Sequence, residues 1–175
     1  MSRANAAGWV AAFAALVVLA NYLIGDSSTP SENSSPAPKS ERTATVLRVV
    51  DGDTILVRGP NGRNERVRYI GVDTPESVKP DSPVECFGHE ASDYNKQLVQ
   101  GRKVRLVPDR EAEDRFGRSL AFVYVGDTFV NAQLISGGYA RTIEIEPNTS
   151  KAEYFADLER VAIRTRKGLW RACDR

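Results

Sequence analysis

Short runs of β-branched residues, separated by tight-turn sequences, constrain the fold of this 175-residue chain more than any other feature. The first run, residues 45–50, ends at Asp51-Gly52-Asp53, and residues 55–58 form the return strand. Asp-Gly between two such runs is typical of a tight hairpin turn. The sequence Gly59-Pro60-Asn61-Gly62 predicts a second turn, after which residues 66–72 form a third strand.

Downstream of these strands, helical and extended patterns alternate. The patterns predict a helix over residues 90–100, strands over 104–107 and 120–125, a short helix over 130–135, an extended segment over 139–145 and a last helix beginning at the capping box Ser150-Lys151-Ala152-Glu153. This element order predicts an α+β fold, a β-barrel with helices packed on it. The five-stranded OB-fold is the obvious candidate.

The N-terminal part of the chain reads as a targeting segment. Residues 6–20 are uninterrupted apolar or small residues, and Arg3 is the only charge before them. A membrane span takes roughly 20 residues, so residues 6–25 are just long enough for an uncleaved anchor. A signal peptide cleaved after Ala20 is the second interpretation of residues 1–25, and a buried helix is a less favoured third. Both targeting interpretations export the rest of the chain.

The segment that follows has a different composition. Residues 26–42 are dominated by Ser, Pro and Asn, which is typical of a flexible linker. The folded domain is therefore expected over residues 43–175. Because hydrophobic residues make up 41% of the chain, this domain can bury a core.

Charge and residue counts exclude several classes of function. Lys and Arg number 24 and Asp and Glu 23, and this net charge of +1 argues against coating nucleic acid through bulk charge. The single histidine, His89, excludes mechanisms that need two histidines in one chain, and His-rich zinc sites. No P-loop, G-x-S-x-G or G-x-G-x-x-G motif occurs.

Four acidic residues gather at predicted strand ends. Asp51 and Asp53 flank the first tight turn, and Asp73 and Glu76 flank Thr74-Pro75 at the end of the third strand. Clustered carboxylates repel one another unless a positive group lies between them. A hard cation with oxygen ligands fits, and calcium is the expected one in an exported domain. Patterning alone still favours ordinary loop aspartates in Asx-turns.

Two arginines extend this interpretation. Arg68 precedes Asp73 in the third strand, and Arg118 follows Gly117 in a charged loop. An arginine fork matches two phosphate oxygens, so a cation and two arginines are a plausible clamp for a reacting phosphate. Each arginine taken alone is more often a surface residue.

Five stretches occur in a characteristic order: Asp51-Gly52-Asp53-Thr54, Val67-Arg68-Tyr69-Ile70-Gly71-Val72-Asp73-Thr74-Pro75-Glu76, Phe87-Gly88-His89-Glu90-Ala91-Ser92, Asp114-Arg115-Phe116-Gly117-Arg118-Ser119-Leu120-Ala121 and Gly168-Leu169-Trp170. Over residues 43–171 this order and spacing resemble the thermonuclease family, typified by staphylococcal nuclease. The resemblance implies an OB-fold barrel and a calcium-dependent nuclease. Such an enzyme cleaves DNA and RNA at the 5′-oxygen and leaves 3′-phosphate ends.

The resemblance also implies a metal site. Asp53 and Asp73 resemble the family's calcium-ligating carboxylates, and the carbonyl of Thr74 resembles its main-chain ligand. Asp51 resembles an acidic residue next to these ligands.

The expected catalytic residues come from the same motifs. Glu76 resembles the glutamate that acts on the attacking water, and Arg68 and Arg118 resemble the two arginines that bind the phosphate and stabilise its transition state. Nucleic acid is the implied partner, and no protein partner is implied. The alternative, a non-catalytic OB-fold module that binds nucleic acid, would not need the acids and arginines together.

One stretch departs from the family pattern. Where the type member has tyrosines that pack on the nucleotide, this chain has Thr142-Ile143-Glu144-Ile145-Glu146. We expect weaker nucleotide binding with little base preference, and repulsion of a nearby phosphate by Glu144 and Glu146. Phe116 and Arg115 could still supply one wall.

The two cysteines lie outside these motifs. In an exported domain they suggest a disulfide between Cys86 and Cys173, with two free thiols as the alternative.

Overall fold

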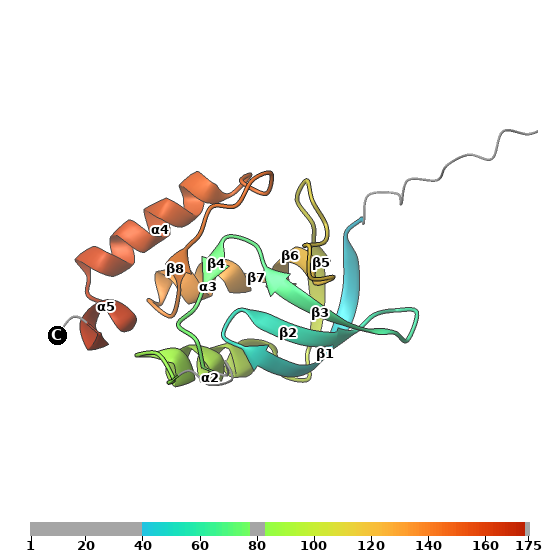
Figure 1. Ribbon diagram of the computed structural model, residues 1–175, viewed down its shortest axis with the longest axis horizontal. Coiled ribbons are helices and arrows are strands. Elements are labelled where there is room, and N and C mark those ends of the chain that lie inside the picture. Colours follow the sequence, from blue (N-terminus) through green and yellow to red (C-terminus); the bar gives the residue numbers. More distant parts are fainter. Residues whose placement is uncertain (1–39, 78–82, 174–175) are drawn as a thin grey trace, which may run out of the picture. The chain divides into compact units, whose positions relative to one another are not determined.

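The computed structural model describes residues 40–77 and 83–173 (Figure 1). The predicted targeting segment, residues 1–25, and nearly all of the predicted linker lie outside these residues. Within the described part of the chain, no helix is both long and apolar enough to cross a bilayer.

Five strands form a closed barrel, as the sequence predicted. They are β1 (Arg42–Asp51), β2 (Thr54–Arg58), β3 (Asn64–Tyr69), β5 (Lys103–Val107) and β6 (Ser119–Val125). Their order is β3-β2-β1-β5-β6, and a parallel pairing of β3 with β6 closes the ring. The five-stranded OB-fold expectation is therefore confirmed.

Alternating β-branched residues explain why these segments form a barrel. In β1, Ala44, Val46 and Val49 are buried, whereas Thr45 and Arg48 are exposed. The register of β1 against β2 is irregular at two points, and such bulges bend a strand around a barrel.

The short strands and helices surround this barrel. They are β4 (Val72–Asp73), β7 (Thr128–Phe129), β8 (Arg141–Thr142), α2 (Gly88–Val99), α3 (Val130–Ser136), α4 (Ala152–Arg164) and α5 (Leu169–Ala172). Strand β4 pairs with β8, and α3 packs against both β6 and α4 (Figure 1).

Two buried asparagines fix helices to the barrel end where β3 stops. Asn131 of α3 accepts the N–H of Val123 at 2.9 Å and donates to the carbonyl of Ile70 at 2.8 Å. Asn95 of α2 accepts the hydroxyl of Tyr69 at 3.0 Å. Since buried polar groups are costly unless paired, these bonds favour one docking position for each helix.

Three local predictions need correction. The predicted strand over 66–72 is interrupted at Gly71, where φ is +74° and an added Cβ would lie 2.5 Å from the Phe155 ring. The predicted extended segment over 139–145 keeps only β8 as a strand. The capping box is absent, because α4 begins at Ala152 and the Ser150 N–H donates to Asp109 instead.

Candidate active site

Asp53 is fixed in position by several hydrogen bonds. It lies in the β1–β2 turn, is buried, and accepts hydrogen bonds from the Thr54 hydroxyl at 3.1 Å and from the Thr74 N–H and hydroxyl at 3.0 and 3.1 Å. Gly52 allows this contact, since a Cβ there would lie 2.6 Å from the Thr74 hydroxyl oxygen. The turn is thereby joined to the chain just after β4.

Arg68 connects Asp53 with Asp73. Its Nη1 forms an ion pair with Asp53 Oδ2, and its Nη2 donates to Asp73 Oδ1 at 3.2 Å. The Asp73 side chain is 50% exposed, so one partner faces solvent and the other is buried. Two carboxylates from different strand ends therefore share a single positive group, as clustered acids require.

The donor set fits a hard cation. Asp53 and Asp73 supply carboxylate oxygens close enough to share one guanidinium, and the Thr74 carbonyl belongs to the same short segment as Asp73. Within the described residues no three His, Cys, Asp or Glu side chains form a metal-binding group. The candidate set is accordingly small, with two carboxylates and one main-chain oxygen.

Asp51 and Glu76 lie beside Asp53. Asp51 Oδ1 accepts the Ser77 hydroxyl at 2.6 Å and the Gly52 N–H at 2.7 Å. Burial raises the pKa of Asp51, and the charges of Asp53 and Glu76 act in the same direction. Glu76 Oε1 accepts the Ser77 N–H at 3.1 Å. Asp51 therefore lies near Asp53 and Glu76, and Asp73 is linked to Asp53 through Arg68; we refer to these four acids as the acid cluster.

Arg118 is held by its own loop. Asp114 Oδ1 accepts the N–H groups of Phe116 and Arg118 at 2.9 and 3.0 Å, and Asp114 Oδ2 accepts Arg118 Nε at 2.7 Å. Burial opposes ionisation of Asp114, but these hydrogen bonds and the Arg118 charge outweigh it and lower the pKa of Asp114. Asp114 therefore binds the Nε of Arg118, and the guanidinium carbon lies 5.5 Å from the centre of the Phe116 ring.

A cleft brings the two arginines together. It is lined by Arg68 and Arg118, by the loop residues Asp114, Arg115 and Phe116, by Ile143, Ile145 and Asn148, and by Tyr69, Ile70, Gly71, Glu111 and Leu120. Arg68 belongs to both the acid cluster and this cleft, so it joins the predicted metal ligands to the predicted phosphate-binding group. Residue spacing alone could not show that residues so far apart in the chain share one cleft, and only the family resemblance implied it.

Residues 142–146, where the sequence departs from the family pattern, do not place their two glutamates in the cleft. Ile143 and Ile145 line the cleft, whereas Glu144 and Glu146 are exposed and are not part of its lining. The predicted repulsion of a phosphate by these two acids therefore has no support in the structure. Ile145 is a site residue that the sequence analysis passed over, although its alternation with Ile143 was a signal for it.

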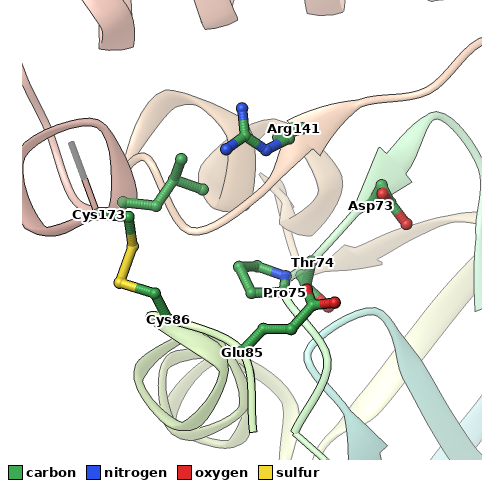
Figure 2. Close-up of a pocket in the computed structure, with 8 residues that line it drawn as sticks. Asp73, Thr74, Pro75, Glu85, Cys86, Arg141 and Cys173 are labelled. Carbon is green, nitrogen blue, oxygen red and sulfur yellow. A yellow bond between two sulfur atoms is a disulfide. The ribbon is translucent and has the colours of Figure 1, made fainter. Parts of the chain in front are cut away.

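A second hollow adjoins the acid cluster. Figure 2 shows Asp73, Thr74, Glu85 and Arg141 around it, with a disulfide between Cys86 and Cys173 at its edge. The two Cα atoms of the disulfide are 5.9 Å apart and 87 residues separate the cysteines. This is the cysteine pair that the sequence suggested. Glu85 is a further residue of this region that no sequence motif indicated.

Comparisons with known proteins agree with this geometry. The model of the family described as staphylococcal nuclease homologue matches residues 66–172. The chain is 38% identical over 163 residues to the thermonuclease of Staphylococcus hyicus, covering 93% of this chain and 95% of that protein. It is likewise 38% identical over 161 residues to the thermonuclease of Staphylococcus intermedius, covering 92% and 94%.

A relative from a different genus carries a related name. Endonuclease YncB of Bacillus subtilis (strain 168) is 38% identical over 147 residues, which cover 81% of this chain and 69% of that protein. The fold and the named relatives define a nuclease, a hydrolase that acts on nucleic acid. The chain belongs to the staphylococcal nuclease family, and the resemblance seen in its motifs is confirmed.

Proposed function

We propose that this nuclease is a calcium-dependent phosphodiesterase that cleaves DNA or RNA and leaves 3′-phosphate ends. The observation that carries the proposal is the position of Arg68, which is shared between the acids Asp53 and Asp73 and lies in the same cleft as Arg118. A site built this way has negative groups for a cation and positive groups for a phosphate, side by side.

The acids divide into two roles in this proposal. Asp53, Asp73 and the Thr74 carbonyl would hold the calcium ion, which suits a hard cation because all three donors are oxygen atoms. The bound ion supplies electrostatic polarisation of the phosphoryl group. Asp51 supports the ligand turn through its bonds to Gly52 and Ser77.

Glu76 takes the role of the base. Its carboxylate orients a water molecule and accepts a proton from it as the water oxygen bonds to phosphorus. The bond between phosphorus and the 5′-oxygen breaks, the 5′-oxygen takes a proton from a solvent water molecule and leaves as a hydroxyl group, and the phosphate stays on the 3′-oxygen. Arg68 and Arg118 hold the phosphate oxygens, where negative charge increases in the transition state.

Arg68 has to exchange partners in this scheme. In the structure its guanidinium lies against Asp53 and Asp73. When these carboxylates hold a cation instead, the attraction that keeps the guanidinium beside them is reduced, and its fork is available to a phosphate. Cation binding and phosphate binding are then coupled through one side chain.

Export of the enzyme belongs to the same proposal. It is supported by the apolar run at residues 6–25 and by a disulfide, a bond typical of oxidising compartments. Membrane anchoring through residues 6–25 remains a prediction from the sequence, as does the alternative of a cleaved signal. Fractionation of the expressing cells, followed by mass analysis of the N-terminus, distinguishes the two.

One assay tests the catalytic proposal. The full chain is incubated with DNA and RNA in calcium, in a chelator, and in the chelator with calcium restored. We expect cleavage only with calcium, with 3′-phosphate and 5′-hydroxyl ends on the products. The Glu76→Gln variant should lose most of the rate under the same conditions. Undiminished cleavage in the chelator, or 5′-phosphate products, would contradict the proposal.

A further inference from the structure

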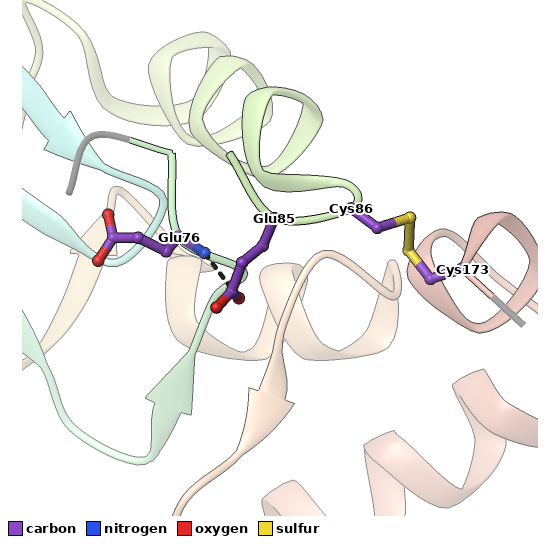
Figure 3. Close-up of a disulfide and its surroundings, with 4 residues drawn as sticks. All are labelled: Glu76, Glu85, Cys86 and Cys173. Carbon is purple, nitrogen blue, oxygen red and sulfur yellow. Dashed lines mark hydrogen bonds between the residues drawn. A yellow bond between two sulfur atoms is a disulfide. The ribbon is translucent and has the colours of Figure 1, made fainter. Parts of the chain in front are cut away.

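Glu85 contacts the main chain of Glu76 from both sides. The Glu85 N–H donates to the Glu76 carbonyl at 2.9 Å, and the Glu85 carboxylate accepts the Glu76 N–H at 3.1 Å. Figure 3 shows this second bond, with the Glu76 carboxylate pointing away from Glu85. Glu85 thus holds the peptide groups on either side of the Glu76 Cα, while Glu76 Oε1 accepts the Ser77 N–H.

Gly88 supports the same main-chain segment. A Cβ at Gly88 would lie 2.6 Å from the Glu76 carbonyl oxygen, so the first turn of α2 approaches this peptide as closely as a glycine allows. The Gly88 N–H donates to the Glu85 carbonyl at 2.9 Å. Residues 85–88 therefore form a support against which the backbone of Glu76 rests.

Glu76 depends on such a support because its own strand has ended. Strand β4 stops at Asp73, and residues 74–76 belong to no helix or strand. Ladder hydrogen bonds therefore do not fix the direction of the Glu76 side chain. A reacting group that is misplaced by about 1 Å can lose a factor of roughly 100 in rate, so the contacts that replace the ladder matter for catalysis.

The disulfide fixes the support itself. Cys86, which follows Glu85, is bonded to Cys173 just after α5 (Figure 3). Helix α5 is in turn docked by a hydrogen bond of 2.8 Å from the Leu169 N–H to the Gly138 carbonyl. The two backbones approach so closely here that an added Cβ on Gly168 would lie 2.2 Å from the Gly138 carbonyl oxygen. The end of the chain is thereby connected to the peptide of Glu76 through Cys86 and Glu85.

We infer that Glu85 is a positioning residue for Glu76 and that the Cys86–Cys173 disulfide holds Glu85 in place. The inference rests on the role of Glu76 under the proposed function. It makes the orientation of the base dependent on a covalent bond formed by the C-terminal segment. An oxidising compartment would then be required for full activity as well as for stability.

Kinetics of single variants of the full chain give the first test. Glu85→Ala removes the carboxylate that accepts the Glu76 N–H, and we expect kcat to fall about tenfold with KM within twofold. Glu85→Gln keeps an acceptor oxygen and should recover most of that loss. The matched control is Glu90→Ala, which removes an exposed carboxylate from the first turn of α2, and should leave kcat unchanged. Equal kcat values for Glu85→Ala and the wild type would overturn the inference.

A double-mutant cycle separates positioning from a general loss of structure. If Glu85 acts through Glu76, Glu85→Ala should lower kcat by less than about twofold in the Glu76→Gln background. The same tenfold loss in both backgrounds would show that Glu85 acts elsewhere. If Glu76→Gln alone has wild-type activity, the proposed role of Glu76 fails, and that outcome is distinct from failure of the inference.

Removal of the disulfide completes the test. The Cys86→Ser/Cys173→Ser variant is compared with the wild type well below both melting temperatures, so that both proteins are folded. We expect a lower kcat with unchanged KM, and little further loss when Glu85→Ala is added. A variant that melts earlier but keeps the wild-type kcat would leave the disulfide a purely structural role and refute this part of the inference.

Discussion

The two sides of the active site are built in different ways. The acid wall, which comprises Asp51, Asp53, Asp73 and Glu76, is tied to the barrel by a network of hydrogen bonds and ion pairs. The apolar wall, which comprises Phe116, Ile143 and Ile145, is exposed by 68%, 36% and 62% respectively. One side is fixed by many polar contacts, whereas the other presents apolar side chains to solvent.

From this contrast we infer which part of the site can vary. Under the proposed function the acids share a cation and activate water, so their relative positions are constrained by that chemistry. An apolar side chain that packs against a nucleobase needs only to provide contact area, so an isoleucine can replace a relative's tyrosine at this position. We therefore expect changes in the acid wall to affect rate and changes in the apolar wall to affect binding.

The largest effect is expected at Arg118, which lines the same cleft as Arg68. Arg118→Lys should lower kcat by about 10³–10⁵-fold, because a point charge cannot replace the fork on a phosphate. This loss corresponds to about 4–7 kcal/mol of transition-state stabilisation. Steady-state kinetics on an oligonucleotide measure it, with Arg110→Lys, at an exposed position of the same loop, as the control. A loss below tenfold would remove Arg118 from the chemistry.

The next effect concerns the disulfide that adjoins Glu85. Loss of the Cys86–Cys173 disulfide, which spans 87 residues, should lower the free energy of unfolding by about 4–5 kcal/mol in the chain-entropy model. Denaturant unfolding of the wild type and of Cys86→Ser/Cys173→Ser measures the difference. Non-reducing mass spectrometry should find no free thiol in the exported protein, and two free thiols would contradict the bond.

The apolar wall can be made to resemble that of a tyrosine-bearing relative. Ile143→Tyr or Ile145→Tyr should tighten the binding of a nucleoside 3′,5′-diphosphate by about 1–3 kcal/mol, because an aromatic ring stacks on a base. Titration calorimetry with calcium present measures the change. Glu144→Tyr is the matched control, since Glu144 is not part of the cleft lining, and it should leave the affinity unchanged. Tightening by the control alone would reverse our assignment of the faces.

The acid wall should also respond to calcium without substrate. At ten times the dissociation constant, binding to the folded state alone raises the free energy of unfolding by about 1.4 kcal/mol. A calcium titration of the melting temperature measures this gain, which should vanish in Asp73→Asn. A melting temperature that is constant in the wild type would argue against a site at Asp53 and Asp73.

The smallest effect is expected in the loop that carries Phe116 and Arg118. The lowered pKa of Asp114 means that its charge stabilises the fold above its ordinary pKa of 3.8, and that this contribution is lost as the pH falls through the lower, folded value. Asp114→Asn should therefore lower the free energy of unfolding by at most about 1 kcal/mol at pH 7, because its ion pair with Arg118 is only half-buried and solvent still screens it. The difference from the wild type should shrink in acid.

Unfolding curves at neutral and acid pH test this prediction. Asp127→Asn, in the exposed turn between β6 and β7, is the control and should change little at either pH. An Asp114→Asn deficit that is equally large in acid would mean that the shape of the loop, and not the charge of Asp114, supplies the stability.

Local patterns in the sequence predicted most of the barrel but not its interruptions. The β-branched runs and turn sequences indicated five strands, and five strands form the barrel. The break at Gly71 was not foreseen because it depends on Phe155, which lies far along the chain. The capping box at Ser150 was wrong for a similar reason, since Asp109 accepts the Ser150 N–H.

The amino-acid sequence supplies the chemical groups of this protein: four acids and an arginine near strand ends, a second arginine in a charged loop, and one pair of cysteines. Their positions relative to one another depend on the tertiary structure. The parallel pairing of β3 with β6 brings Arg68 into the cleft with Arg118, and the disulfide brings the chain end to Glu85, which supports Glu76. These interactions differ in sequence separation: turn chemistry and alternation act within a few residues, whereas barrel closure gains its free energy from burying strands that are distant in sequence.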